Sequence, residues 1–338
     1  MNRTQKRASC SQRQRITLEQ LSTVAPLDSL ADDVRAGLAA CPKSLPPKYF
    51  YDETGSWLFE EICKTPEYYL TRTEDALLAK VAEAVIESVR PFRILELGSG
   101  SSRKTAHLLR ACENQRCYAR YEPFDVCSEM LVHAAERLVD EHAWLNVDAF
   151  VGDYLHDLQH IGDDGGTRLV LFLGSTIGNF SQDAAENFLR ALRSVMNSDD
   201  RFLLGLDRVK DTRVLNAAYN DAAGLTAAFN RNVLNVINRE LDGGFRPHTF
   251  AHRAVYNEAQ ARIEMYLDSL QAQHVVIGAL SMEVAFTAGE PLLTEISRKF
   301  TRASMQSLLA GGGFVAEQHF ESQDGHFSLV LARPANDG

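Results

Sequence analysis

The apolar run Arg168-Leu-Val-Leu-Phe-Leu173 restricts the possible folds more than any other stretch of this sequence. Such a run is typical of a strand that is buried on both faces of a parallel sheet. Phe202-Leu-Leu-Gly-Leu-Asp207 has the same character, and a helical pattern over 184–196 lies between the two runs. The sequence therefore predicts an α/β chain in which strands and helices alternate.

The alternation extends to both sides of these runs. Helical periodicity predicts a helix over 16–38, and Thr71-Arg-Thr-Glu74 matches a capping box ahead of a further helix. The remaining expected elements on this side are strands at 92–97, 120–125 and near 150–153, and helices at 57–62, 77–89, 104–111 and 128–139.

The C-terminal part of the pattern indicates how the sheet ends. A helix is expected over 304–309, stopped by Gly311-Gly-Gly313, and two antiparallel strands are expected at 314–320 and 326–332. A two-strand finish of this kind is a feature of the Rossmann-like methyltransferase fold. Nicotinamide-binding relatives usually end their sheet differently.

The alternation of strands and helices is interrupted between about residues 211 and 293. A helical stretch over 212–238 is followed by β-prone alternation over 251–270 and 275–284. We therefore expect a second, inserted α+β domain beside a Rossmann-like class I sheet.

Composition and charge exclude several classes of partner. The chain has 338 residues, and its 35 Lys and Arg against 45 Asp and Glu give a net charge of −10. A chain this acidic lacks the basic footprint that binds a nucleic-acid backbone. No segment reaches the roughly 18 consecutive apolar residues of a membrane span. We expect neither a nucleic acid nor a membrane as partner.

The N-terminus and the cysteines indicate the compartment. Residues 1–14 are basic but have no apolar run behind them, so they predict a flexible tail and not a secretory signal. No two cysteines form a CxxC pair, and the histidines do not cluster with them, so free thiols in a reducing cytoplasm and no metal are expected. The six cysteines are Cys10, Cys41, Cys63, Cys112, Cys117 and Cys127.

The segment Glu96-Leu-Gly98-Ser-Gly100-Ser-Ser102 lies between an expected strand and an expected helix. Glycines there let the backbone turn tightly and approach a ligand. A dinucleotide site needs a third glycine, and a P-loop needs a glycine before its lysine, but Arg103 stands at both places. An acidic residue ahead of the turn fits S-adenosylmethionine best, although a plain βα turn remains possible.

Polar residues follow the next strands at the same edge of the sheet, where open α/β sheets place their ligands. Glu122 or Asp125 could hold a ribose diol, and Asp153 with Tyr154 could lie near an adenine. After the fourth strand comes Gly174-Ser-Thr-Ile-Gly-Asn179-Phe, in which the asparagine could anchor a substrate carboxylate or amine. Each alone could be an ordinary turn residue.

Four motifs carry a resemblance that runs from about residue 45 to the C-terminus. The chain resembles the L-histidine Nα-methyltransferase family of ergothioneine biosynthesis. The motifs are Pro47-Lys-Tyr-Phe-Tyr-Asp-Glu-Thr-Gly-Ser, Thr65-Pro-Glu-Tyr-Tyr-Leu-Thr-Arg-Thr-Glu, Phe172-Leu-Gly-Ser-Thr-Ile-Gly-Asn-Phe and Thr294-Glu-Ile-Ser-Arg-Lys-Phe.

The resemblance implies a cofactor and a substrate site. The positions that match the S-adenosylmethionine site are Gly98, Lys104, Asp125, Asp153 and Tyr154. Those that match the histidine site are Tyr51, Tyr68, Gly174, Asn179, Tyr219, Met265, Glu295 and Ser297. Asn179, Tyr68 and Tyr219 would hold the amino-carboxylate, while Glu295 and Ser297 would hold the imidazole; Tyr51 and Asn179 are the catalytic candidates.

The resemblance also implies a division of the chain. Residues 15–72 and 210–299 would form the histidine-binding domain, and residues 73–209 and 300–338 the cofactor-binding domain. Taken singly, the tyrosines and Met265 could instead be core residues, and Glu295 could pair with Arg298 or Lys299 at the surface.

The implied activity is stepwise methylation of the histidine α-amine to hercynine by a cytoplasmic, monomeric enzyme without a metal. Tyr51 or water could accept the amine proton. Two alternatives stay open: a methyltransferase for another aromatic amino acid or a histidine derivative, and a non-catalytic cofactor-binding module. A third, an ATP-dependent enzyme that uses residues 98–105 as a P-loop, fails on Arg103.

Overall fold

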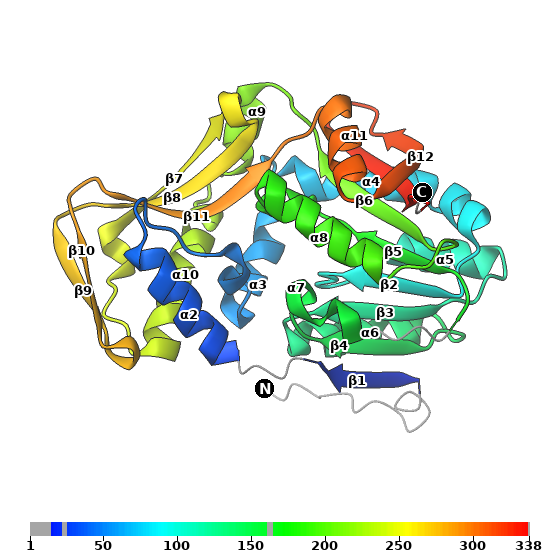
Figure 1. Cartoon of the computed structure of the whole chain (residues 1–338), viewed down its shortest axis with the longest axis horizontal. Coiled ribbons are helices and arrows are strands. Elements are labelled where there is room, and N and C mark those ends of the chain that lie inside the picture. The colour runs from blue at the N-terminus through cyan, green and yellow to red at the C-terminus, as the bar shows by residue number, and fades with distance from the viewer. Residues whose placement is uncertain (1–14, 22–25, 161–164, 337–338) are drawn as a thin grey trace.

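The computed structural model describes residues 15–21, 26–160 and 165–336. A large sheet with helices on both faces occupies one side of the molecule, and a smaller body of helices and antiparallel strands lies beside it (Figure 1).

The large sheet has the strand order β1-β4-β3-β2-β5-β6-β13-β12. The strands from β1 to β6 pair in parallel, and β13 and β12 are antiparallel. This confirms the expected alternation and the two-strand finish. The strands are β1 (Ile16–Gln20), β2 (Arg93–Leu97), β3 (Arg120–Asp125), β4 (Val147–Val151), β5 (Arg168–Phe172), β6 (Arg201–Asp207), β12 (Phe314–Glu321) and β13 (Phe327–Pro334).

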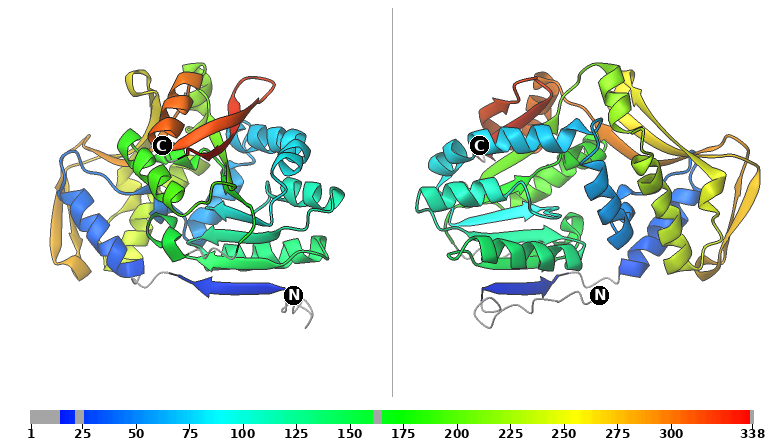
Figure 2. Two further views of the ribbon diagram at one scale, coloured as in Figure 1. Left: turned by 45° about the vertical axis from the view of Figure 1, so that its right-hand side comes forward. Right: turned by 180° about the vertical axis from the view of Figure 1, so that it is seen from behind.

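Both faces of this sheet are buried, as the apolar run in β5 predicts. Leu169 and Leu171 point into one apolar cluster, and Val170 and Phe172 into the other. Figure 1 looks onto the second face, covered by α8 (Gln182–Ser194) and α11 (Arg302–Gly311). The view from behind in Figure 2 looks onto the first face, covered by α4 (Tyr69–Val89), α5 (Ala106–Asn114) and α6 (Ser128–Glu141).

The smaller body has one apolar core of its own. That core joins residues from positions 30–70 with residues from positions 215–292. Its sheets have the orders β11-β8-β7 and β10-β9. Its elements are α2 (Pro26–Ala39), α3 (Glu53–Ile62), α9 (Thr212–Ala218), α10 (Leu225–Leu241), β7 (Phe250–Asn257), β8 (Arg262–Ser269), β9 (Gln273–Ile277), β10 (Met282–Phe286) and β11 (Pro291–Arg298).

Short helical turns complete the described part of the chain. They are η1 (Pro47–Phe50), α7 (Tyr154–Asp157), η2 (Leu158–His160), η3 (Thr176–Asn179), η4 (Pro247–Thr249), η5 (Glu258–Gln260) and η6 (Gly278–Leu280).

The helix expected over 16–38 is wrong in its first part. Residues Ile16–Gln20 form β1, which pairs in parallel with β4, and the helix α2 begins only at Pro26. A long-range backbone ladder decides this strand, and local periodicity does not report such pairing. Since β1 belongs to the large sheet, the expected histidine-binding segment cannot begin at residue 15.

The capping box expected at Thr71-Arg-Thr-Glu74 is also wrong. The helix α4 already begins at Tyr69, and Glu74 is fully buried within it. Its carboxylate has partners elsewhere in the fold, which are described below.

Three further observations concern the expected partners and compartment. In the described ranges, no helix is long and apolar enough to cross a membrane. Those ranges also hold no cluster of three or more His, Cys, Asp or Glu side chains suited to a metal ion. The cysteines described there are unpaired thiols, while Cys10 and the tail over 1–14 lie outside the described residues.

Candidate active site

The glycine-rich turn after β2 and the last residue of β3 form one hydrogen-bonded unit. The amides of Gly98 and Ser99 donate to the Phe124 carbonyl at 2.8 and 3.2 Å. The Gly100 amide donates to Oδ2 of Asp125 at 2.8 Å, and the Cys127 amide donates to Oδ1 at 3.0 Å. Burial raises the pKa of Asp125, against the pull of these amides.

This turn has free capacity for a ligand. Gly98 has a φ of 68°, a conformation that side chains disfavour. The Ser99 hydroxyl is buried and has no hydrogen-bond partner among the described residues. An orphaned hydroxyl next to a strand-end carboxylate fits a polar ligand such as the ribose and methionine parts of S-adenosylmethionine.

Glu96 has a structural task inside this turn. Its buried carboxylate accepts from the Thr105 hydroxyl at 2.6 Å and from the Tyr121 hydroxyl. Burial raises the pKa of Glu96 to about 7. The acidic residue that suggested the cofactor thus anchors the start of α5.

The geometry distinguishes the two candidates for the ribose-binding carboxylate, Glu122 and Asp125. Glu122 is buried in the middle of β3 and faces Arg93, with 3.5 Å between Oε1 and Nη1. Asp125 ends the strand and contacts the glycine turn. Only Asp125 therefore has its carboxylate at the turn.

Asp153 and Tyr154 follow β4 at the same edge of the sheet. Asp153 caps α7 by accepting from the Leu155 amide at 2.9 Å, and its Oδ2 lies 3.4 Å from Nζ of Lys48 on η1. A Cβ on Gly98 would lie 3.7 Å from the Tyr154 ring, so Tyr154 neighbours the glycine turn. Burial raises the pKa of Tyr154.

Glu74 joins two expected site residues and was not found from the sequence. Its two carboxylate oxygens accept from the Gly174 amide at 2.8 and 2.9 Å, and Lys104 donates to the same group. Both partners belong to loops that follow strands of the large sheet. The wrong capping box contained this residue, but nothing in the local pattern showed its long-range contacts.

On the side of the smaller body, Glu295 and Met265 face each other across the ladder between β11 and β8. The register shifts between Leu293 and Glu295, and Thr294 at this bulge donates to the Asn230 amide oxygen at 2.6 Å. A bulge re-aims the side chain beside it. The bulge therefore fixes the direction in which Glu295 points.

Glu295 is a carboxylate without a partner in the described part of the chain. It pairs with neither neighbour that the sequence offered, because Arg298 contacts Gln182 and Lys299 contacts Asp207. Burial raises the pKa of Glu295 to about 7, although the positive charge of Lys299 opposes this shift. A half-buried acceptor without a donor favours a ligand that brings one.

Tyr219 and Ser297 contact the buried ammonium group of Lys299, a residue that the sequence did not assign to the site. The Tyr219 hydroxyl donates to Oγ of Ser297 at 2.9 Å, and Nζ of Lys299 lies 2.9 Å from both oxygens. Lys299 also pairs with Asp207 at 2.9 Å. Asp207 in turn accepts from Tyr69 at 2.7 Å.

Tyr51 and Tyr68 belong to an aromatic group with Phe59, Phe229 and Tyr219. The ring of Tyr51 meets Phe59 and Phe229 edge-on at 5.6 and 5.5 Å, and the ring of Tyr68 meets Tyr219 at 6.1 Å. Burial raises the pKa of Tyr51 well above its usual value, and the charge of Glu295 raises it further. The two side chains are half-buried and lie close enough for the charge of Glu295 to act on the Tyr51 hydroxyl.

The loop that carries Asn179 lies against β11. A Cβ on Gly178 would come within 2.9 Å of the Arg298 carbonyl oxygen, so only glycine fits this approach. Asn179 is half-buried, and within the described residues its side chain makes no hydrogen bond. The loop that carries Asn179 thus packs against the strand that carries Glu295.

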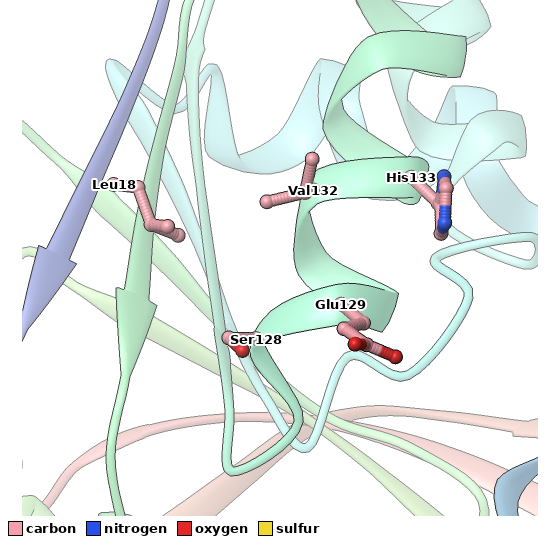
Figure 3. A pocket seen from close by; sticks show the side chains of 5 residues that line it. All are labelled: Leu18, Ser128, Glu129, Val132 and His133. Carbon is pink, nitrogen blue, oxygen red and sulfur yellow. The ribbon is translucent and has the colours of Figure 1, made fainter. Parts of the chain in front are cut away.

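A separate surface hollow lies away from these residues. It has a volume of about 340 Å³ and is lined by Leu18, Ser128, Glu129, Val132 and His133. Figure 3 shows the last four on the first turns of α6. None of its lining residues belongs to the candidate site.

Comparison with known proteins identifies the family. The family model of histidine-specific, S-adenosylmethionine-dependent methyltransferases matches residues 30–334. The chain belongs to this family. Its cofactor is therefore S-adenosylmethionine, as the turn after β2 indicates.

Two curated relatives and one solved structure illustrate the similarity. The chain is 44% identical to the histidine N-alpha-methyltransferase of Mycolicibacterium smegmatis, over 92% of this chain and 97% of that protein. It is 26% identical to ergothioneine biosynthesis protein 1 of Schizosaccharomyces pombe, over 89% of this chain and 40% of that protein. The CcbJ methyltransferase of Streptomyces caelestis covers 77% of this chain and 98% of its own, with a TM-score of 0.46 and 13% identity.

Replacing Asp125 by alanine is expected to weaken S-adenosylmethionine binding by about tenfold or more, because a buried charge-assisted acceptor is lost together with a loop anchor. Isothermal titration calorimetry measures the change. Asp148→Ala, at a half-buried carboxylate that pairs with Arg120 on the same sheet, is the matched control. Equal affinity of Asp125→Ala and the unsubstituted protein would contradict this role.

Proposed function

We propose that this protein transfers methyl groups from S-adenosylmethionine to the α-amine of L-histidine in three steps, and so makes hercynine, the first intermediate of ergothioneine biosynthesis. The single observation that carries the proposal is the half-buried, unpartnered carboxylate of Glu295 beside Ser297 and opposite Met265. Membership of the histidine-specific family supports the same assignment.

The choice of substrate follows from the chemistry of Glu295. An imidazole N–H donated to a carboxylate is a charge-assisted hydrogen bond. A phenyl ring would cover the carboxylate without a donor, at a cost of about 1–3 kcal/mol or more. Met265 packs beside it as an apolar wall, with 1% of its surface exposed. This combination favours a small ring that carries nitrogen.

The other site residues bind either the substrate or the cofactor. Asn179, Tyr68 and Tyr219 hold the amino-carboxylate of the substrate, and Gly174 lies in the loop that carries Asn179. Gly98, Lys104, Asp125, Asp153 and Tyr154 hold the cofactor. S-adenosylmethionine supplies an activated methyl group when bound, so the chain itself needs to align the nucleophile and exclude water.

The amine must lose a proton before it attacks. Tyr51 lies close to Glu295, and its raised pKa keeps its hydroxyl protonated at neutral pH. In that state it acts as a hydrogen-bond partner that orients the amine, and the proton leaves through water. Asn179 is the second group that orients the amine.

The proposal extends to assembly and location. We propose a monomer that acts on a small molecule. The unpaired cysteines in the described residues support a reducing cytoplasm. Residues 15–72 apart from β1, together with residues 210–299, would bind histidine, and residues 73–209 and 300–338 would bind the cofactor; the separate apolar cores support this division.

Incubation with S-adenosylmethionine and L-histidine is expected to add three methyl groups to the α-amine of histidine, as the proposed function requires. Mass spectrometry of the product is the measurement, and L-phenylalanine and L-tryptophan are the controls. Turnover of either control in preference to histidine would establish the alternative function instead. No methylated product with any of them would leave only a cofactor-binding module.

Replacing Glu295 by alanine is expected to lower kcat/KM for L-histidine by about tenfold or more, because the imidazole loses its charge-assisted acceptor. Cofactor affinity is expected to change little, since Glu295 is on the other side of the site. Glu290→Ala is the control: Glu290 lies just before β11 and pairs with Lys43 at the surface. Unchanged histidine turnover in Glu295→Ala would refute the assignment.

The pH dependence follows from the raised pKa of Glu295, about 7. Below that pH the group is protonated and accepts the imidazole N–H poorly, so KM for histidine is expected to rise as the pH falls through 7. The variant Glu295→Gln cannot titrate, and it is expected to lose this limb while keeping any limb due to the substrate itself. Superimposable pH profiles of KM for both proteins would contradict the prediction.

A further inference from the structure

Lys299 uses all its hydrogen-bonding capacity inside the protein. Its side chain is fully buried, and Nζ lies 2.9 Å from the Tyr219 hydroxyl, 2.9 Å from Oγ of Ser297 and 2.9 Å from Oδ2 of Asp207. An ammonium group has three donors and no acceptor. Both hydroxyl oxygens must therefore accept from Lys299.

The next hydrogen bond runs from Tyr219 to Ser297. The Tyr219 hydroxyl, which accepts from Lys299, donates its own proton to Oγ of Ser297 at 2.9 Å. Oγ of Ser297 then accepts twice, from Lys299 and from Tyr219, which fills both of its lone pairs. The remaining capacity of Ser297 is one proton to donate, and no acceptor for it occurs among the described residues.

Ser297 and Glu295 point to the same face of β11, because they are two positions apart beyond the bulge. A donor and an acceptor thus stand side by side on one strand. A neutral imidazole carries one N–H donor and one bare nitrogen acceptor, so it matches this pair.

We propose that Lys299 is a positioning residue: together with Tyr219 it occupies both lone pairs of the Ser297 oxygen, so that Ser297 offers its proton to a neutral imidazole held edge-on between Glu295 and Ser297. The inference rests on the proposed function, since it specifies how the same site holds histidine. Lys299 does not contact the ring itself and acts through Ser297.

The chain offers a matched control for this role. Lys210 also pairs with Asp207 and is nearly as buried, with 5% of its side chain exposed against 0% for Lys299. Lys210 contacts the Tyr69 hydroxyl at 2.6 Å and makes no contact with Ser297 or Tyr219 in the described residues. Replacing either lysine by methionine removes one of the two ammonium groups that pair with Asp207. Only Lys299→Met also removes a hydrogen bond to Oγ of Ser297.

The experiment measures KM and kcat for L-histidine and the Kd of S-adenosylmethionine in Lys299→Met and Lys210→Met. Lys299→Met is expected to raise KM about tenfold, with kcat and the cofactor Kd within about threefold, since one hydrogen bond to the ring loses its orientation. Lys210→Met is expected to keep KM within about twofold. Equal KM values in the two variants, or parallel losses in KM and cofactor affinity, would overturn the proposal.

A second comparison tests whether Lys299 acts through Ser297. In a Ser297→Ala background no hydroxyl remains to orient, so Lys299→Met is expected to raise KM no further than about twofold. A renewed tenfold rise would show that Lys299 acts by another route, and would overturn the role. In Lys299→Met the carboxylate of Asp207 keeps its pairing with Lys210, and Lys299→Leu carries the same measurement where the methionine variant fails to fold.

The unsubstituted protein separates the two claims. If it does not methylate histidine, the proposed function fails, and the account of Lys299 fails with it. If it does, and the lysine variants have the KM of the unsubstituted protein, only the role of Lys299 is overturned.

Discussion

The ion pair between Asp207 and Lys299 is the interaction on which the arrangement of this molecule depends. The chain leaves the large sheet at the end of β6, where Asp207 lies, and returns to it just after Lys299. At this joint the Phe300 amide donates to the Asp207 carbonyl at 2.8 Å, so backbone and side chains close the same contact. Lys299 alone would be a buried charge without compensation, which costs several kcal/mol, whereas Asp207 is also paired with Lys210.

The joint places the two halves of the candidate site. Tyr219 and Ser297 contact the ammonium group of Lys299, while Asp207 accepts a hydrogen bond from Tyr69 at the start of α4. Five residues further along that helix, Glu74 accepts from the Gly174 amide and pairs with Lys104. The groups expected to bind substrate and those expected to bind cofactor are thereby tied to one rigid set of buried contacts.

The sequence predicted the large sheet well, because strands buried on both faces leave apolar runs that need no tertiary knowledge. It failed at β1, where pairing with β4 decides the structure, and at Glu74, whose partners lie 30 and 100 positions away. The resemblance supplied the list of site residues, and the structure shows Glu295 unpaired at a bulge. Lys299 and Asp207 could not be found locally, since a charged residue at a strand end ordinarily indicates a surface.

The central claim is that L-histidine lies at the seam between the two parts of the molecule, with its ring at Glu295 and its amine toward the turn at Gly98. A crystal structure with L-histidine and S-adenosylhomocysteine tests this most directly. The account predicts one ring nitrogen within hydrogen-bond distance of Glu295, the other facing Ser297, and the amine directed at the sulfur. A ring that lies away from β11, with Glu295 bound only to water or to Lys299, would contradict it.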